Sequence, residues 1–280
     1  ESFGLSEATM RAIRNKHYTV STPVQAGCIP PMLAGKDVIA KAPTGTGKTM
    51  AFGIPIIERI DRESEEVQAV ILAPTRELAM QITDEMRDIA VCHEGVRLVC
   101  LYGGQPIGKQ IDALKRRPQI VVATPGRLSD HMKRRTVSLK SVRTVVLDEA
   151  DRMLDMGFIH DVRKILKWLP AKKQTMLFSA TMPPEIADLV SSLLHNPARV
   201  AVDPVSSPVE AIRQWVYPVD KANKTRLLAW LMEQKQVKNA LVFTRTKHGA
   251  NKVARDLVKE GISAAAIHGN KSQTARQQAL

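Results

Sequence analysis

Several features that would set a chain apart from ordinary intracellular proteins are scarce or absent here. The three cysteines, Cys28, Cys92 and Cys100, form no CxxC pair, which argues against a disulfide frame or a zinc site. The seven histidines show no HxxxH spacing, so none is assigned to a metal. No apolar run approaches the roughly 18 residues of a membrane helix, and the first residues show no signal-peptide core. We therefore expect a reduced, cytoplasmic protein.

Aromatic and acidic residues are also in short supply. Aromatics make up 4% of the chain, so we expect a mainly aliphatic core. The 28 acidic residues face 41 basic ones, which gives a formal charge of +13. From Ala211 onward, 13 basic residues stand against 4 acidic ones. This imbalance favours a polyanionic partner such as nucleic acid, although a basic surface can also serve solubility alone.

Short apolar runs alternate with helical patterns along most of the chain. Runs of this kind, separated by helices, predict an α/β fold with a parallel sheet covered on both faces. The predicted strands are residues 37–40, 70–73, 96–101, 120–123, 144–147, 175–178 and 199–202. The predicted helices are residues 6–16, 50–60, 77–90, 106–115, 126–134, 158–169 and 184–194. Ligands of such sheets bind beyond the carboxyl ends of the strands, which is where each candidate motif lies.

A second alternation begins after a stretch rich in proline and serine at residues 203–208. It predicts strands at 213–219, 240–244 and 262–267, and helices at 223–233, 247–260 and 272–280. We expect a first domain at residues 1–205, a linker at 206–211, and an incomplete second domain at 212–280.

Residues 42–49, Ala-Pro-Thr-Gly-Thr-Gly-Lys-Thr, lie between a predicted strand and a predicted helix. This context is typical of a phosphate-binding loop, in which glycines such as Gly45 and Gly47 let backbone N–H groups converge on phosphate oxygens. Lys48 would reach the β- and γ-phosphates, and the Thr49 hydroxyl would hold Mg²⁺. The alternative is a chance turn rich in glycine and threonine. Thr44 and Thr46 complete the candidate loop.

An acidic motif, Asp-Glu-Ala-Asp at residues 148–151, follows another predicted strand. Asp148 suits Mg²⁺ through its waters, and Glu149 suits polarisation of the water that attacks the γ-phosphate. The alternative is an acidic N-cap of the next helix. Ser179 and Thr181 also follow a strand, and their hydroxyls could bond this motif and relay the nucleotide state; a plain turn is the alternative.

Three further loops offer hydroxyls, arginines or bare N–H groups at helix starts, which bind phosphates without reading sequence. Ordinary turn and capping chemistry is the alternative for each. The residues concerned are Thr75 and Arg76, then Gly104, then Thr124, Gly126 and Arg127. Upstream, Tyr18 could stack on a base, and the Gln25 amide offers the donor and acceptor that adenine's edge needs, although both residue types are common near proline turns.

Taken in order, these motifs resemble those of the DEAD-box RNA helicases, and the resemblance covers essentially the whole chain. The matching segments are residue 3 with residues 18–25, then 42–49, 74–79, 103–104, 124–127, 148–151, 179–181, 241–246 and 273–276. Ala42, which departs from a generic phosphate loop, is what that family carries. His17 and Ser21 stand where the family usually has Gly and Pro.

The resemblance implies two RecA-like domains that close around ATP–Mg²⁺ and single-stranded RNA in a monomer. It implies that Phe3, Tyr18, Gln25 and Asp151 belong to the ATP site, with Tyr18 stacking on adenine and Gln25 reading its edge. It implies that RNA phosphates are held by the three loops above and, from the second domain, by Thr246 and Arg276.

The family's later second-domain arginines have no counterpart before Leu280, so we expect weak ATP turnover from this piece. Two alternatives remain open. One is a nucleotide-dependent RNA clamp with little turnover. The other is a DNA helicase or translocase, which the Tyr18 and Gln25 arrangement disfavours.

Overall fold

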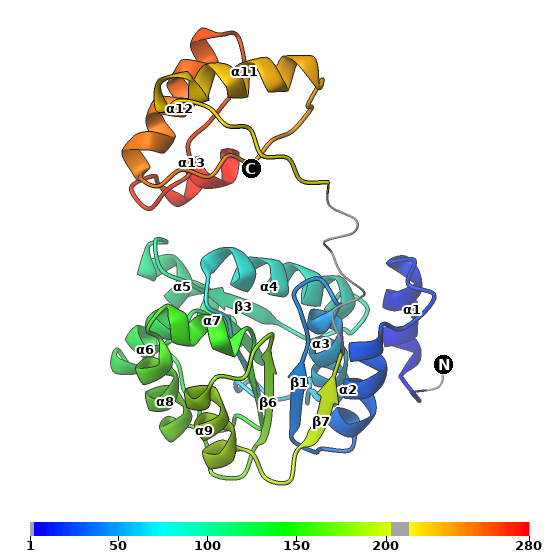
Figure 1. The fold of residues 1–280 in the computed structure, drawn as a ribbon. Coiled ribbons are helices and arrows are strands. Elements are labelled where there is room, and N and C mark those ends of the chain that lie inside the picture. Colours follow the sequence, from blue (N-terminus) through cyan, green and yellow to red (C-terminus); the bar gives the residue numbers. More distant parts are fainter. Residues whose placement is uncertain (1–2, 203–212, 280) are drawn as a thin grey trace. The chain divides into compact units, whose positions relative to one another are not determined.

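The computed structural model describes residues 3–202 and 213–279 (Figure 1). The chain divides into two compact units, with the division between residues 207 and 208. The expected linker at 206–211 lies outside the described residues.

The first unit contains one seven-stranded sheet in which every strand pair is parallel, as the sequence predicts. The strand order is β3-β4-β2-β5-β6-β1-β7. The most buried strands are runs of aliphatic residues, because both of their faces are covered by helices. The strands are β1 (Val38–Lys41), β2 (Ala69–Leu72), β3 (Leu98–Leu101), β4 (Ile120–Ala123), β5 (Thr144–Leu147), β6 (Gln174–Ser179) and β7 (Ala198–Ala201).

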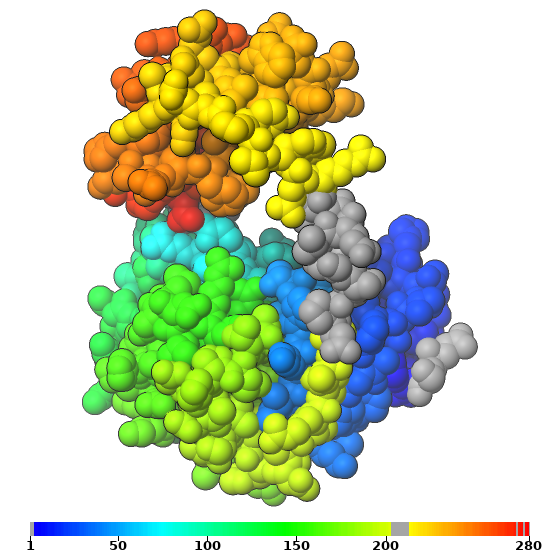
Figure 2. All heavy atoms as spheres, in the orientation of Figure 1, coloured from blue at the N-terminus to red at the C-terminus, as the bar shows by residue number. Residues whose placement is uncertain are grey.

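Helices cover both faces of this sheet and create two apolar cores. Alternate side chains of a strand enter different cores: Val38 and Ala40 belong to one, and Ile39 to the other. The first core is closed by α1 (Glu7–Asn15), α2 (Pro23–Leu33), α3 (Lys48–Arg59) and α4 (Arg76–Ala90). The second is closed by α5 (Ile107–Leu114), α6 (Pro125–Lys133), α7 (Ala150–Asp155), α8 (Ile159–Trp168) and α9 (Pro184–Leu193). Figure 2 shows the atoms of α6, α8 and α9, green to yellow-green, as a continuous cover.

Helix α2 occupies a segment whose start reads as a turn in the sequence, because it contains Pro23. Proline fits the first turn of a helix, where its missing N–H would have no helical partner. Thr22 and Gln25 close a capping box around the helix start, each side chain bonding the other's backbone N–H. The proline therefore begins the helix and does not exclude it.

Polar clamps join segments at the amino ends of the central strands. The buried Asp37 carboxylate accepts hydrogen bonds from the backbone N–H of Thr175 at 2.7 Å and of His195 at 2.8 Å. The Gln174 side-chain amide donates to the Met32 carbonyl at 2.9 Å, and its oxygen accepts from Arg59 at 2.8 Å. These contacts fix β1, β6, α2 and α3 together at the end of the sheet opposite the candidate motifs.

The second unit keeps the predicted helices but not the predicted strands. Its helices are the short 3-10 turn η1 (Lys221–Asn223), α11 (Lys224–Gln234), α12 (Lys247–Lys259) and α13 (Gln273–Gln278). Among the described residues, the segments predicted as strands at 213–219, 240–244 and 262–267 form no ladder. The expected parallel sheet of the second domain is therefore wrong for this structure.

The physical reason is that a helix satisfies its backbone locally, whereas a strand needs a neighbour and a covered face. Among the described apolar residues of this unit, Leu257 is the one that is almost fully buried, and Phe243 and Leu241 remain 88% and 72% exposed. The segments predicted as strands therefore lack a covered face.

None of the helices that the structure describes, in either unit, has the length and the apolar character of a membrane span.

Candidate nucleotide and nucleic-acid site

The candidate phosphate loop connects β1 to α3 at the carboxyl end of the sheet. Gly45 and Gly47 have φ of 83° and 88°, in the left-handed region that favours glycine. A Cβ added to Gly47 would lie 2.6 Å from the Gln25 amide nitrogen, so this position also needs a residue without a side chain. The Thr46 hydroxyl donates to the Pro43 carbonyl at 2.8 Å, which tightens the turn.

Lys48 opens α3 and turns its ammonium group back toward the loop and the end of β5. Its Nζ lies 3.4 Å from the Ala42 carbonyl oxygen and 3.8 Å from Asp148 Oδ1. Both side chains are almost completely buried. Burial raises the pKa of Asp148 to about 6, against the opposing effect of the Lys48 charge. Lys48 and Asp148 thus form a buried pair of opposite charge directly beside the loop.

Glu149 has a backbone conformation that is unusual for its residue type. Its φ of 51° and ψ of 52° are left-handed, and its N–H donates to Asp148 Oδ1 at 3.0 Å. The carboxylate accepts a bond from the Thr44 hydroxyl at 3.1 Å and pairs with Arg152 at 3.5 Å. The kink after β5 thus directs two successive acidic side chains, Asp148 and Glu149, to the phosphate loop.

Asp151 connects the acidic motif to the segment after β6. Its Oδ2 accepts from both the N–H and the hydroxyl of Thr181 at 2.8 Å, and its own N–H donates to the Ser179 hydroxyl at 3.2 Å. Burial alone would raise the pKa of Asp151, but the two bonds that Thr181 donates to the carboxylate hold that pKa below its ordinary value. This contact is the hydroxyl-to-acid bond that the sequence suggests.

The phosphate loop and the first two acidic residues line a cavity of about 370 Å³, whereas Thr46 and Asp151, also expected in the ATP site, are not among its lining residues. The Tyr18 ring stands at the cavity, 47% exposed, with Lys16 Nζ 5.8 Å from its centroid. The Gln25 oxygen accepts from the Thr22 N–H at 2.9 Å, and its amide donates to the Gly47 carbonyl at 3.1 Å. The residues expected in the ATP site that line this cavity are Tyr18, Gln25, Thr44, Gly45, Gly47, Lys48, Thr49, Asp148 and Glu149. Phe3 instead packs on the core beside α1 to α4.

The candidate RNA-binding loops follow β2, β3 and β4, which are neighbours in the sheet. Thr75 caps α4, accepting from the Leu78 N–H at 3.2 Å. The Arg76 guanidinium lies so close to Gly104, whose φ is 87°, that a Cβ there would be 2.3 Å from Nη1. Thr124 is the N-cap residue of α6, and Gly126 and Arg127 are in its first turn. The fold therefore gathers the three loops, which are far apart in sequence.

Two residues that sequence reasoning missed hold this region together. Gln110 in α5 donates to the Tyr102 carbonyl at 2.8 Å and to the Gln105 side chain at 2.9 Å. Its oxygen accepts from Arg127 at 3.3 Å and lies 3.0 Å from His131 Nε2. Burial, together with Arg127, lowers the pKa of His131, which keeps the ring neutral. In the sequence, the one sign of this role is that Gln110 is a polar residue on the apolar face of the predicted helix 106–115.

Thr246 and Arg276 belong to the second unit. Thr246 caps α12, with its hydroxyl accepting from the Gly249 N–H at 3.0 Å, and Arg276 lies in α13. Their expected contact with RNA depends on how the two units meet, so it stays a prediction.

Among the described residues, no group of three or more His, Cys, Asp or Glu residues could hold a metal ion.

A parallel sheet with a glycine loop after its first strand, a buried lysine, and paired carboxylates after β5 is the arrangement of a RecA-like phosphate-loop fold. The chain belongs to the DEAD/DEAH box helicase family, whose pattern matches residues 22–189. It is 46% identical over 280 residues to the DEAD-box ATP-dependent RNA helicase CshA of Bacillus licheniformis, and 45% identical to that of Bacillus subtilis.

These matches cover 100% of this chain but 57% and 56% of the two relatives, so the chain spans a little over half of their length. A solved DEAD box protein of the hyperthermophile Methanococcus jannaschii is 39% identical, with a TM-score of 0.68. That match covers 98% of this chain and 74% of the solved one.

Proposed function

We propose that the chain is the nucleotide- and RNA-binding part of an ATP-dependent RNA helicase, with a first domain at 1–205 and the start of a second at 212–280. The observation that carries the proposal is the convergence of Lys48, Asp148 and Glu149 on one cavity beside the glycine loop. Lysine and backbone N–H groups suit phosphate, and a carboxylate after a strand suits its metal ion.

ATP is the nucleotide that the cavity favours. The Gln25 amide has two N–H donors and an oxygen with two lone pairs. One donor is used by Gly47 and one lone pair by Thr22, which leaves one donor and one acceptor. Adenine's N6 and N7 edge offers the matching pair. Tyr18 supplies the ring on which the base stacks.

Mg²⁺ fits the oxygen donors that these elements offer. The Thr49 hydroxyl and the Asp148 carboxylate are hard ligands of the kind Mg²⁺ takes, usually with several waters retained. The ion would neutralise phosphate charge. Lys48 binds the β- and γ-phosphates, Glu149 orients and deprotonates the attacking water, and Asp151 with Ser179 and Thr181 supports the acidic motif from behind.

RNA would lie across the loops after β2, β3 and β4. Arg76 and Arg127 provide charge, and Thr75 and Thr124 provide hydroxyls. The exposed residues Gly104 and Gly126 offer backbone N–H groups. Groups of these kinds bind phosphates, and none reads a base. Thr246 and Arg276 would add contacts from the second unit. Preference for RNA over DNA would come from the 2′-hydroxyl.

Glu149→Gln tests the catalytic part of this proposal. Loss of a positioned general base should reduce ATP turnover by about 10²- to 10⁴-fold, because the water is no longer activated. Binding of a fluorescent ADP with Mg²⁺ should change little, since glutamine keeps the shape. Glu185→Gln, at an exposed site in α9, is the matched control.

ATP hydrolysis would be measured with and without a single-stranded RNA, and with the DNA of the same sequence. Equal turnover in wild type and Glu149→Gln would refute the assigned role. Nucleotide-dependent RNA binding with no turnover in wild type would indicate the clamp instead. Stimulation by DNA as strong as by RNA would point to the DNA enzyme.

A further inference from the structure

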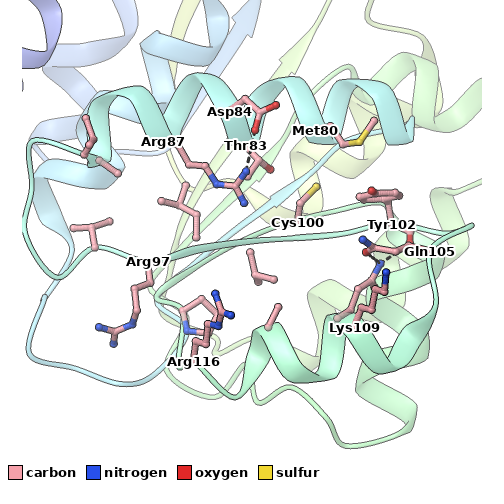
Figure 3. Close-up of a pocket in the computed structure, with 18 residues that line it drawn as sticks. Met80, Thr83, Asp84, Arg87, Arg97, Cys100, Tyr102, Gln105, Lys109 and Arg116 are labelled. Carbon is pink, nitrogen blue, oxygen red and sulfur yellow. Dashed lines mark hydrogen bonds and ion pairs between the residues drawn. The ribbon is translucent and has the colours of Figure 1, made fainter. Parts of the chain in front are cut away.

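A second, larger cavity of about 770 Å³ lies away from the nucleotide pocket, between α4, β3 and α5 (Figure 3). Residues 96–100 all line it, and they are consecutive. Side chains of a strand alternate between its two faces, so one cavity can touch consecutive residues only along the strand's edge. The cavity therefore runs beside the open edge of β3.

The hydrogen bonds of β3 show which backbone groups face this cavity. The carbonyls of Arg97 and Leu101 accept from β4 or its flanks, at Ile120 (3.2 Å) and Thr124 (3.0 Å). In a parallel pair, alternate residues direct both N–H and C=O to the same neighbour. Leu98 and Cys100 therefore direct theirs away from β4, and β3 is the terminal strand of the described sheet.

Charge around the cavity has one predominant sign. Four cationic side chains line it, Arg87, Arg97, Lys109 and Arg116, against one carboxylate, Asp84, which pairs with Arg87 at 2.9 Å. Figure 3 shows these side chains on both flanking helices and at the end of the groove. Between them the lining is apolar, with Val91, Val96, Leu98, Ala113 and Pro118.

We propose that this groove binds an extended acidic segment of a partner protein, which adds to β3 as a further strand. The edge offers N–H donors and C=O acceptors in alternation, and a peptide backbone supplies the matching partners. Acidic side chains of the segment meet Arg97, Lys109 and Arg116, since Arg87 is already paired with Asp84, and apolar side chains of the segment pack on the apolar lining. A phosphodiester backbone carries acceptors only and would leave the outward carbonyls unmatched, which disfavours RNA here.

Three synthetic peptides test the proposal with the whole chain. The probe is a fluorescent Val-Glu-Val-Glu-Val-Glu-Val peptide; the second replaces Glu by Lys, and the third keeps the charge as Val-Glu-Pro-Glu-Pro-Glu-Val. Fluorescence anisotropy should show saturable binding of the first and binding at least about tenfold weaker for the others. Proline removes backbone donors, so the third peptide separates strand addition from simple charge attraction.

Variants locate the binding. Lys109→Glu with Arg116→Glu reverses two exposed charges and should weaken the probe about tenfold, while RNA-stimulated ATP hydrolysis is unchanged. Lys140→Glu with Lys172→Glu reverses two exposed charges elsewhere and should leave the probe's affinity unchanged. Amide hydrogen exchange should slow at Leu98 and Cys100 when the peptide binds, because these N–H groups gain partners.

Three kinds of result would overturn the proposal. One is no saturable binding of the first peptide. Another is binding without the expected specificity: the proline peptide binds equally well, or the groove variant leaves the affinity of the probe unchanged. The third is loss of binding of a ten-nucleotide oligouridine in the groove variant with no peptide binding, which would assign the cavity to the RNA path.

Discussion

Replacing Gln110 by leucine tests how the region around Arg127 is held in place. Leucine has nearly the volume of glutamine, so it leaves little cavity, but it removes the amide. The Gln110 side chain is almost completely buried and makes four hydrogen bonds, to Tyr102, Gln105, Arg127 and His131. The variant therefore loses these bonds without a change in packing.

The expected loss in the free energy of unfolding depends on which partners of Gln110 keep another hydrogen bond in the variant. Arg127 still donates to the Gln105 carbonyl at 3.1 Å, and His131 Nδ1 still lies 2.8 Å from the Thr136 hydroxyl. His131 is fully buried, so its Nε2 would be left unpaired at a cost of about 1–3 kcal/mol. Adding about 0.5–1 kcal/mol for each of the three half-exposed partners, Tyr102, Gln105 and Arg127, gives a total loss of about 2.5–6 kcal/mol in the free energy of unfolding.

Urea unfolding measures this loss, and titration with a single-stranded RNA measures the effect on binding. Thr136→Val removes the hydroxyl contacts with His131 Nδ1 and with the His131 carbonyl; it should cost about 1–2 kcal/mol and serves as the graded control. Gln110→Glu keeps the acceptor for Arg127 and should restore part of the RNA affinity. If Gln110→Leu unfolds within about 0.5 kcal/mol of wild type, the bonding described around Arg127 is wrong.

Three further predictions concern other parts of the site. Gly104→Ala places a Cβ against Arg76 at a left-handed backbone position, so it should lower the free energy of unfolding in urea by about 1–2 kcal/mol and weaken RNA binding. Gly108→Ala is the control and should be neutral or stabilising, because its Cβ would have nothing within 4 Å. Equal effects of the two substitutions would contradict the described packing of Arg76 on Gly104. Because the folded pKa of Asp148, about 6, exceeds its ordinary 3.8, Asp148 contributes stability that is present below pH 3.8 and lost as pH rises to 6. That loss is about 3 kcal/mol in metal-free buffer, and a wild-type profile parallel to that of Asp148→Asn would refute it. Thr181→Val should raise the pKa of Asp151 toward its ordinary value, as followed by carboxyl NMR titration; no change would mean that the Thr181 hydroxyl does not bond the acid.

Much of the first unit could be predicted from sequence because its signals are local. A buried strand, glycines and a helix start lie within a few residues around Lys48, and the seven apolar runs became the seven strands. The phosphate loop and the acidic motif meet because both follow strands of one parallel sheet. The left-handed backbone of Glu149 carries no such signal, since a non-glycine residue adopts it only under constraint from its surroundings.

The parts that sequence did not predict depend on distant partners. Gln110 and Arg127 lie on different helices, and they meet only because β3 and β4 are adjacent. The predicted strands of the second unit have the right composition, but pairing requires neighbours that a pattern of single segments cannot supply. Helix α2 was hidden by Pro23, Pro30 and Pro31, which usually mark breaks and here are tolerated inside the helix.

The clamps made by Asp37 and Gln174 have a practical consequence for engineering. They fasten the amino ends of β1 and β6, whereas the candidate nucleotide and RNA loops occupy the carboxyl ends. Substitutions that strengthen the clamped end can therefore raise the melting temperature with little effect on turnover. Substitutions in the loops at the carboxyl ends of the strands can in turn be tolerated, because the contacts of Asp37 and Gln174 at the amino ends still hold the sheet and its helices together. The two ends of the sheet are therefore regions in which substitutions can be optimised independently.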